Sequence, residues 1–112
     1  MQPPQEGSLL RIFIGEADKC EGKPLYEWIV MKAREHELAG ATVLRGMMGF
    51  GAKTRQIHTF RFDTLSEDMP IIVEIVDIQD RLERFIEVIE PYIQAGLVTI
   101  EKAQIKFYRF EP

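Results

Sequence analysis

The chain has 112 residues, which is enough for one domain. It is 46% apolar and 29% charged, a composition typical of a globular protein and not of a disordered one. Its net charge of −4 argues against general nucleic-acid binding, and its short apolar runs exclude a transmembrane helix.

The N-terminus and the cysteine content predict where the protein acts. Residues 1–7 are polar, and we expect a disordered lead-in here, not a signal peptide. The single cysteine, Cys20, excludes an intrachain disulfide and a multi-cysteine metal site. We therefore expect one cytoplasmic domain over residues 8–112.

The first half of that domain predicts a strand, a helix and a second strand. Apolar residues alternate over 8–15, which favours a strand. A charged loop follows, and Pro24 suits the first position of a helix for which Gly40 is the expected C-cap. Residues 42–48 predict the second strand.

The next segment predicts a loop and then the strongest strand of the chain. Residues 52–58 are polar and basic and favour an exposed loop, after which Phe60, Phe62 and Leu65 suggest a further length of strand. Apolar residues alternate over 71–76, which predicts a strand with little ambiguity.

The last third predicts a helix and a final strand. Asp77 or Asp80 can cap the helix, and Pro91 should kink it or restart it. Gly96 ends the helical pattern, and the final strand is predicted over 103–108.

This β-α-β-β-α-β order predicts a ferredoxin-like α+β sandwich, in which two helices cover one face of a four-stranded antiparallel sheet. The first and third strands are then antiparallel neighbours at its centre. Their second face is also mostly apolar, which predicts a cover by another subunit; its apolar residues are Leu9, Phe13, Ile72 and Val76. Arg11 and Glu74 are the charges on that face, and we expect them to pair.

The same topology gathers three loops at one edge of the sheet: residues 16–23, 49–58 and 95–102. Together they offer a helix N-terminus, glycine backbone and basic side chains, which are the parts of a phosphate site. No acidic residue occurs between Glu37 and Asp63. The candidate anion-binding residues are Gly22, Lys23, Arg45, Gly46, Gly49, Phe50, Gly51, Lys53, Arg55 and His58.

Plainer interpretations stay open for these residues. The basic segment is also typical of a solvated loop, and the glycines of a bulge or tight turn. Among the cations, Arg45 lies on a strand and is expected to contribute more to anion affinity than Lys53. Cys20 is expected to be inert and partly exposed, and Glu16 and Asp18 are either a functional carboxylate pair or solvated.

Several motifs in the right order resemble a known family. They are Leu10-Arg11-Ile12-Phe13-Ile14-Gly15-Glu16, Gly22-Lys23-Pro24-Leu25-Tyr26, Gly40-Ala41-Thr42-Val43-Leu44-Arg45-Gly46, Gly49-Phe50-Gly51, Ile57-His58-Thr59, Leu65-Ser66-Glu67-Asp68-Met69-Pro70 and Val73-Glu74-Ile75-Val76-Asp77. Over about residues 9 to 105 the chain resembles the PII-like family called domain of unknown function one-ninety.

The resemblance implies a homotrimeric, non-enzymatic regulator with no obligatory cofactor. It implies adenine-nucleotide binding in clefts between subunits, and a loop that contacts a partner such as a fluoride-exporting membrane transporter. Ala52-Lys53 follows Gly49-Phe50-Gly51, where PII proteins have Arg-Gln, so AMP is a more cautious expectation than ATP. The alternatives are a trimeric metal- or anion-sensing module, with His58, Glu16 and Asp18 as ligands, and a small enzyme that uses the same cleft.

Overall fold

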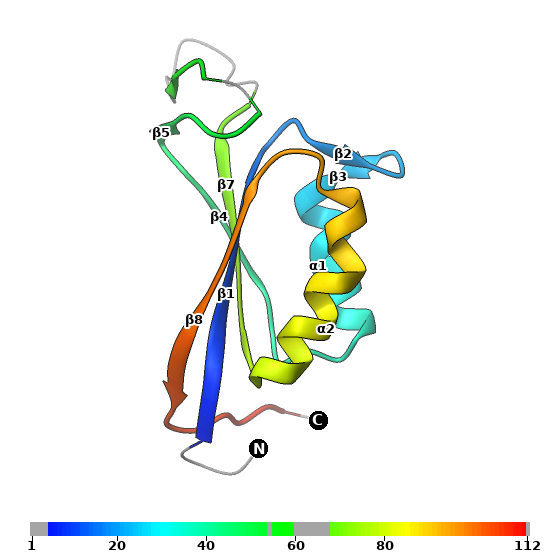
Figure 1. The fold of residues 1–112 in the computed structure, drawn as a ribbon, viewed down its shortest axis with the longest axis vertical. Coiled ribbons are helices and arrows are strands. Elements are labelled where there is room, and N and C mark those ends of the chain that lie inside the picture. The colour runs from blue at the N-terminus through cyan, green and yellow to red at the C-terminus, as the bar shows by residue number, and fades with distance from the viewer. Residues whose placement is uncertain (1–4, 54, 60–67, 112) are drawn as a thin grey trace.

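The computed structural model describes residues 5–53, 55–59 and 68–111 (Figure 1). Within that part of the chain the elements follow in the order β1 (Gln5–Gly15), β2 (Lys19–Cys20), β3 (Lys23–Pro24), α1 (Leu25–Glu35), β4 (Thr42–Arg45), β5 (Met48–Gly49), β6 (His58–Thr59), β7 (Pro70–Asp77), α2 (Gln79–Ile89), the 3₁₀ helix η1 (Glu90–Tyr92) and β8 (Leu97–Ile105).

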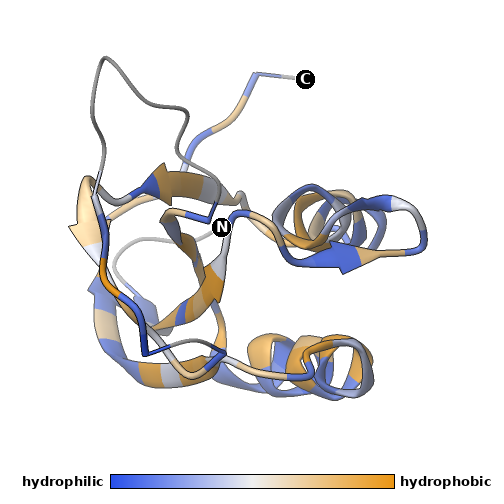
Figure 2. Cartoon of the chain, turned by 90° about the horizontal axis from the view of Figure 1, so that it is seen from above, coloured by the Kyte–Doolittle hydropathy of each residue, from blue (hydrophilic) through white to orange (hydrophobic). Residues whose placement is uncertain are grey.

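A four-stranded antiparallel sheet forms one layer of the molecule. Its order is β4-β7-β1-β8, so β1 and β7 lie at the centre, as the sequence predicts. In their register Leu10 lies opposite Ile75, and Arg11 lies opposite Glu74. The two helices lie side by side against one face of this sheet (Figure 2). The architecture is the predicted ferredoxin-like fold.

The alternation along the central strands explains where the core lies. Side chains of a strand point to opposite faces in turn, and the helix-facing set is apolar in both strands. Those residues are buried, and they are Leu10, Ile12 and Ile14 of β1 with Ile71, Val73 and Ile75 of β7. The helices contribute further core residues, among them Ile29 of α1 and Leu82, Phe85 and Ile89 of α2. Among the described residues, no helix is long and apolar enough to cross a membrane.

Strand β1 begins three residues earlier than predicted. Gln5, Glu6 and Gly7 pair with Ile105, Gln104 and Ala103 of β8. The prediction of a disordered lead-in over residues 1–7 is therefore wrong for 5–7, while 1–4 lie outside the described residues. The polar composition of residues 5–7 does not predict a strand. These residues become part of one only because β8, near the other end of the chain, pairs with them.

Helix α1 ends five residues before the predicted C-cap glycine. The backbone N–H of Glu37 donates to the carbonyl of Arg34, and that of Leu38 donates to the carbonyl of Ala33. Glu37 has a left-handed conformation, with φ of 57°. These two bonds form a Schellman motif, which usually carries glycine at the left-handed position. Gly40 is not the C-cap because Glu37 has already reversed the chain.

The second strand is shorter than predicted. β4 stops at Arg45, and the N–H of Gly46 donates to the carbonyl of Pro70 at 2.7 Å. The chain then turns out of the main sheet, and β5 pairs with β6 in a separate hairpin. His58 belongs to β6 and not to the predicted loop. Phe60, Phe62 and Leu65 lie outside the described residues.

Helix α2 is not capped in the predicted way. The Asp77 carboxylate is buried, and its Oδ2 accepts a hydrogen bond from the Ala39 N–H at 2.8 Å. It therefore fastens the segment after α1 to the end of β7, and neither Asp77 nor Asp80 provides a side-chain cap among the described contacts. Pro91 restarts the helix as η1, which confirms that prediction.

The final strand begins six residues before its predicted start. β8 covers Leu97–Ile105, and Leu97 pairs with Phe13. β8 is an edge strand with little buried surface, so its alternation is weaker than that of β7. Lys102 pairs with Ser8, near the far end of β1, and therefore does not belong to the loop edge.

The sheet face opposite the helices carries the predicted ion pair. Arg11 Nε lies 2.9 Å from Glu74 Oε2, and Arg11 Nη1 lies 2.7 Å from Glu101 Oε1. The pairing of Arg11 with Glu74 is confirmed within one chain. Glu101 is an addition, because it enters this face only through the corrected register of β8.

Candidate functional site

Three connections meet at the upper end of the sheet in Figure 1. They are the link from β1 to β2, the β5–β6 hairpin and the segment 93–96 that leads into β8. The expectation that three loops gather at one edge is therefore confirmed. The third loop is much shorter than predicted, because β8 already begins at Leu97.

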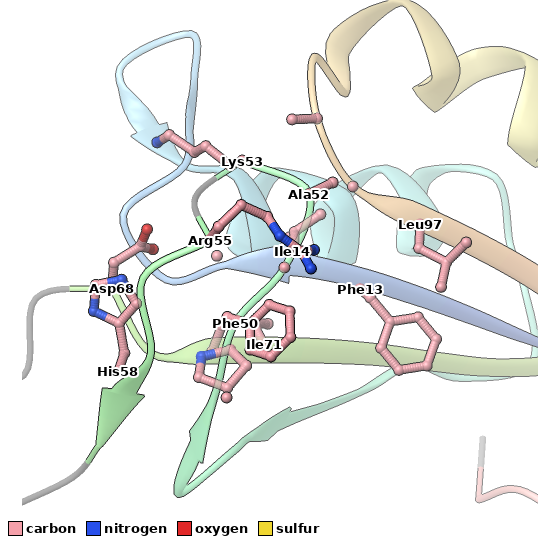
Figure 3. Close-up of a pocket in the computed structure, with 16 residues that line it drawn as sticks. Phe13, Ile14, Phe50, Ala52, Lys53, Arg55, His58, Asp68, Ile71 and Leu97 are labelled. Carbon is pink, nitrogen blue, oxygen red and sulfur yellow. The ribbon is translucent and has the colours of Figure 1, made fainter.

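A cavity of about 450 Å³ lies at this end of the sheet. Its walls are largely apolar, and Figure 3 shows Phe50, Ile14, Ile71 and Phe13 around it. Among the described residues, four polar side chains also line it: Lys53, Arg55, His58 and Asp68. The remaining lining residues are Gly15, Gly49, Gly51, Ala52, Pro70, Ala95, Gly96 and Leu97. Such a mixture suits a ligand with an apolar ring and an anionic group.

The glycines have different roles at this site. A Cβ at Gly46 would approach Pro70 Cγ to 2.8 Å, and one at Gly49 would approach it to 3.2 Å. These two glycines are thus explained by close packing on Pro70. A Cβ at Gly51 would meet no described atom within 4 Å, although Gly51 lines the cavity. Its bare backbone is therefore open to a ligand.

Lys53 is joined to a buried carboxylate. Its Nζ lies 2.9 Å from Asp18 Oδ1, and the other Asp18 oxygen accepts a hydrogen bond from the Gly15 N–H at 3.0 Å. The hydrogen bond to Asp18 and its negative charge raise the pKa of Lys53. Asp18 is thus neither a solvated carboxylate nor half of a pair with Glu16, because each acid faces a separate cation.

Arg55 and His58 occupy the hairpin side of the cavity. The Arg55 guanidinium lies 4.4 Å from the centre of the Phe50 ring, a cation–π arrangement. His58 Nε2 is buried and has no hydrogen-bond partner among the described residues. Asp68 Oδ1 accepts from the Ala17 N–H at 2.9 Å and so connects the start of β7 to the β1–β2 link.

Arg45 lies apart from these groups. Its Nε bonds to both carboxylate oxygens of Glu16 at 3.1 Å, and it is not among the described residues that line the cavity. The position of Arg45 argues against the expected ranking of the cations. Lys53 and Arg55 are better placed than Arg45 to meet an anion in the cavity.

Gly22 has a structural explanation, and Lys23 follows it directly in the chain. They belong to the β2–β3 hairpin, whose two turn residues, Glu21 and Gly22, have φ of 51° and 80°. Positive φ at both positions is typical of a type I′ turn, which favours glycine. Neither residue is among those described as lining the cavity.

Apart from Phe50, the apolar walls are not visible in the sequence as part of a site. The sequence pattern places Phe13 and Ile14 only on a strand, and Leu97 only in a loop. The strand register brings them together, because Phe13 pairs with Leu97 and Ile14 pairs with Ile71 at the same end of the sheet.

Cys20 and the acidic residues give little support to a reactive thiol or a metal-binding site. Cys20 is buried, not partly exposed, and burial raises the pKa of its thiol, so it is expected to be unreactive. In the described part of the chain, no group of three or more His, Cys, Asp or Glu residues is placed to hold a metal ion.

Residues 7–105 match the family model DUF190, described as Uncharacterized ACR. The chain belongs to the DUF190 family. It is 39% identical over 97 residues to a UPF0166 protein of Aquifex aeolicus, covering 87% of this chain and 90% of that protein. It is also 31% identical over 101 residues to a UPF0166 protein of Methanocaldococcus jannaschii, covering 89% and 92% of the two chains. The resemblance seen in the motifs is thereby confirmed.

Solved structures of PII-like proteins share this fold. CPII, a nitrogen regulatory PII-like protein from Thiomonas intermedia K12, bound to ADP, AMP and bicarbonate, superposes with a TM-score of 0.69 at 15% identity, covering 93% of this DUF190 chain and 92% of CPII. A putative PII-like signaling protein from Thermus thermophilus gives a TM-score of 0.65 at 13% identity, covering 93% of each chain. The DUF190 chain therefore has a PII-like fold.

Proposed function

We propose that this protein is a PII-like, trimeric regulator that binds an adenine nucleotide in the cavity at the loop end of the sheet. The observation that carries the proposal is the composition of the cavity. Apolar walls, the open backbone of Gly51 and the cations Lys53 and Arg55 converge there. An apolar ring and a phosphate group would each find complementary partners in it.

AMP is the nucleotide that we expect to bind best. The cavity of about 450 Å³ is of the size that accommodates a small ligand. Two cations among the described lining residues match one phosphate better than three, although ADP and ATP belong in the same test. The structurally similar CPII was solved with ADP and AMP, which agrees with a nucleotide of this class.

We propose that the trimer forms through the sheet face opposite the helices. Leu44, Val76 and Leu97 expose 45%, 39% and 56% of their surface on this face, and Leu9, Phe13 and Ile72 are only half-buried. Each such side chain contributes roughly 1.5–3 kcal/mol when it is fully buried. A contact here would also extend to the cavity, because Phe13 and Leu97 belong to both.

The β5–β6 hairpin is the surface that we propose for a partner protein. Met47, Met48 and Ile57 are exposed there, and flexible methionines suit an adaptable contact. Since the hairpin also carries Phe50 and Arg55, a bound nucleotide would change the surface that a partner meets. The partner that we propose is a membrane transporter, such as a fluoride exporter. This protein would approach it from the cytoplasm.

Calorimetry with AMP, ADP, ATP and adenosine tests the nucleotide, and sedimentation at micromolar concentration tests the trimer. We expect AMP to bind in the micromolar to millimolar range and to be recovered unchanged, as in a regulator without catalytic turnover. Absence of binding at millimolar nucleotide would refute the proposed ligand. A monomer in sedimentation would refute the assembly.

A further inference from the structure

Asp18 is placed to hold the cation that the cavity would offer to an anion. It is buried, with 8% of its surface exposed. Its two carboxylate oxygens have separate partners, because Oδ2 accepts from the Gly15 N–H and Oδ1 accepts from Lys53 Nζ. The bond to Gly15 needs only one oxygen and no negative charge. The negative charge of Asp18 therefore acts on Lys53, with which it forms an ion pair.

Lys53 lies between two hollows. It lines the main cavity, and it also lines a neighbouring hollow of about 310 Å³ to which Asp18 belongs. In Figure 3 the ammonium of Lys53 points away from the Phe50 ring. Rotation about its side-chain bonds could direct the same ammonium to an anion in the main cavity. An anion there and the Asp18 carboxylate would then compete for one cation.

We propose that Asp18 is a positioning residue that competes with the ligand for the Lys53 ammonium and so limits the preference of the site for anionic over neutral ligands. The inference rests on the proposed function, because it concerns the phosphate of the proposed nucleotide. About half of the Lys53 side chain is exposed, so solvent screens this ion pair and a phosphate can displace it.

The ion pair between Arg45 and Glu16 provides a matched control. Arg45 is the last residue of β4, and its partner Glu16 belongs to the β1–β2 link, as Asp18 does. The distance from Arg45 Nε to Glu16 Oε1 is 3.1 Å. Arg45, however, is not among the described residues that line the cavity. Neutralising Glu16 thus removes a comparable charge without releasing a cation that lines the cavity.

The experiment compares AMP and adenosine binding by calorimetry in the full chain. Asp18→Asn keeps an oxygen for the Gly15 N–H but loses the ion pair, so AMP should bind about fivefold tighter, while adenosine binding stays unchanged. Glu16→Gln should leave the affinity ratio of the two ligands near the wild-type value. Lys53→Met should weaken AMP alone, and adding Asp18→Asn to Lys53→Met should give no gain.

Each other result overturns the inference. If Asp18→Asn leaves AMP affinity unchanged or weaker while wild type binds AMP, Asp18 does not compete for Lys53. A gain that persists in the double variant would show that Asp18 acts through another group. If Asp18→Asn folds poorly, Lys53→Met still decides, because equal losses for AMP and adenosine would exclude Lys53 as the phosphate-selective cation. If wild type binds neither ligand, the proposed function and this inference fail together.

Discussion

Three glycine-to-alanine substitutions separate the fold from the ligand site. Gly96 and Gly51 both line the cavity, whereas Gly40 does not belong to its described lining. A Cβ at Gly96 would lie 2.8 Å from the Phe13 carbonyl oxygen and 3.3 Å from Ile14 Cγ2. At Gly51 and at Gly40 it would meet no described atom within 4 Å. None of the three has a left-handed φ, so alanine can adopt the φ and ψ of each position, and the variants differ only in what the added methyl group contacts.

The distances give the expected magnitudes. At Gly96 the contact is with backbone, so β1 or the segment before β8 must shift, and overpacking of this kind costs about 1–3 kcal/mol. Alanine returns about 0.4–1 kcal/mol by restricting the unfolded chain. We expect Gly96→Ala to lower the free energy of unfolding by about 1–2 kcal/mol, or Tm by roughly 4–16 °C. Gly51→Ala and Gly40→Ala should be neutral or slightly stabilising.

Ligand affinity should follow a different order. Gly51→Ala places a methyl group where we propose that the nucleotide approaches the backbone, so AMP affinity should fall about tenfold or more, equivalent to about 1.4 kcal/mol. Gly40→Ala should bind AMP as wild type does.

Urea denaturation and AMP calorimetry on the three variants provide both measurements. Wild-type affinity in Gly51→Ala would show that the ligand does not approach this backbone. Wild-type stability in Gly96→Ala would show that the close contact relaxes without cost.

Three further predictions concern single side chains. Lys53→Ala should weaken AMP binding about tenfold, since a phosphate contact is a charge-assisted hydrogen bond, whereas Arg45→Ala should change it less than about twofold; equal losses in calorimetry would refute this order. Arg11→Ala should reduce stability more than Glu74→Ala, because Arg11 also holds Glu101, and a double-mutant cycle in urea should be non-additive; strict additivity would show no interaction. Burial raises the pKa of the Cys20 thiol, so the thiol stays protonated over a wider pH range in the folded chain. The free energy of unfolding should therefore decline as pH rises above the pKa that this thiol has in the unfolded chain. Iodoacetamide should alkylate folded Cys20 more slowly than unfolded Cys20, with a rate that rises at higher pH, and equal rates would contradict the burial.

The structure agrees best with the sequence-based prediction in the middle of the sheet. The alternation of apolar residues over 8–15 and 71–76 predicted both central strands, their buried faces and the contact between Arg11 and Glu74. These features depend on a period of two within each strand, and on a topology that leaves few ways to pair them. The gathering of three loops at one edge follows from that same topology.

The ends of the elements were harder to predict. α1 ends before Gly40 because Glu37 takes the left-handed conformation usual for glycine. Two other ends depend on distant residues, and β4 stops where Gly46 bonds to Pro70. The pairing of Gln5 with Ile105 extends β1 into a polar segment. In each case a hydrogen bond formed in the folded chain overrides the local preference of the sequence.

Local patterns in the sequence predict the ferredoxin-like fold and the basic and glycine residues from which a site could be built. Which of these residues share a cavity depends on the folded arrangement, since Lys53 pairs with Asp18 whereas Arg45 pairs with Glu16. Periodicity within a strand is a local property that the order of residues carries directly. The choice of partner between two loops depends on how the whole sheet brings their ends together, and on where the end of β1 meets the start of β8 to form the apolar walls.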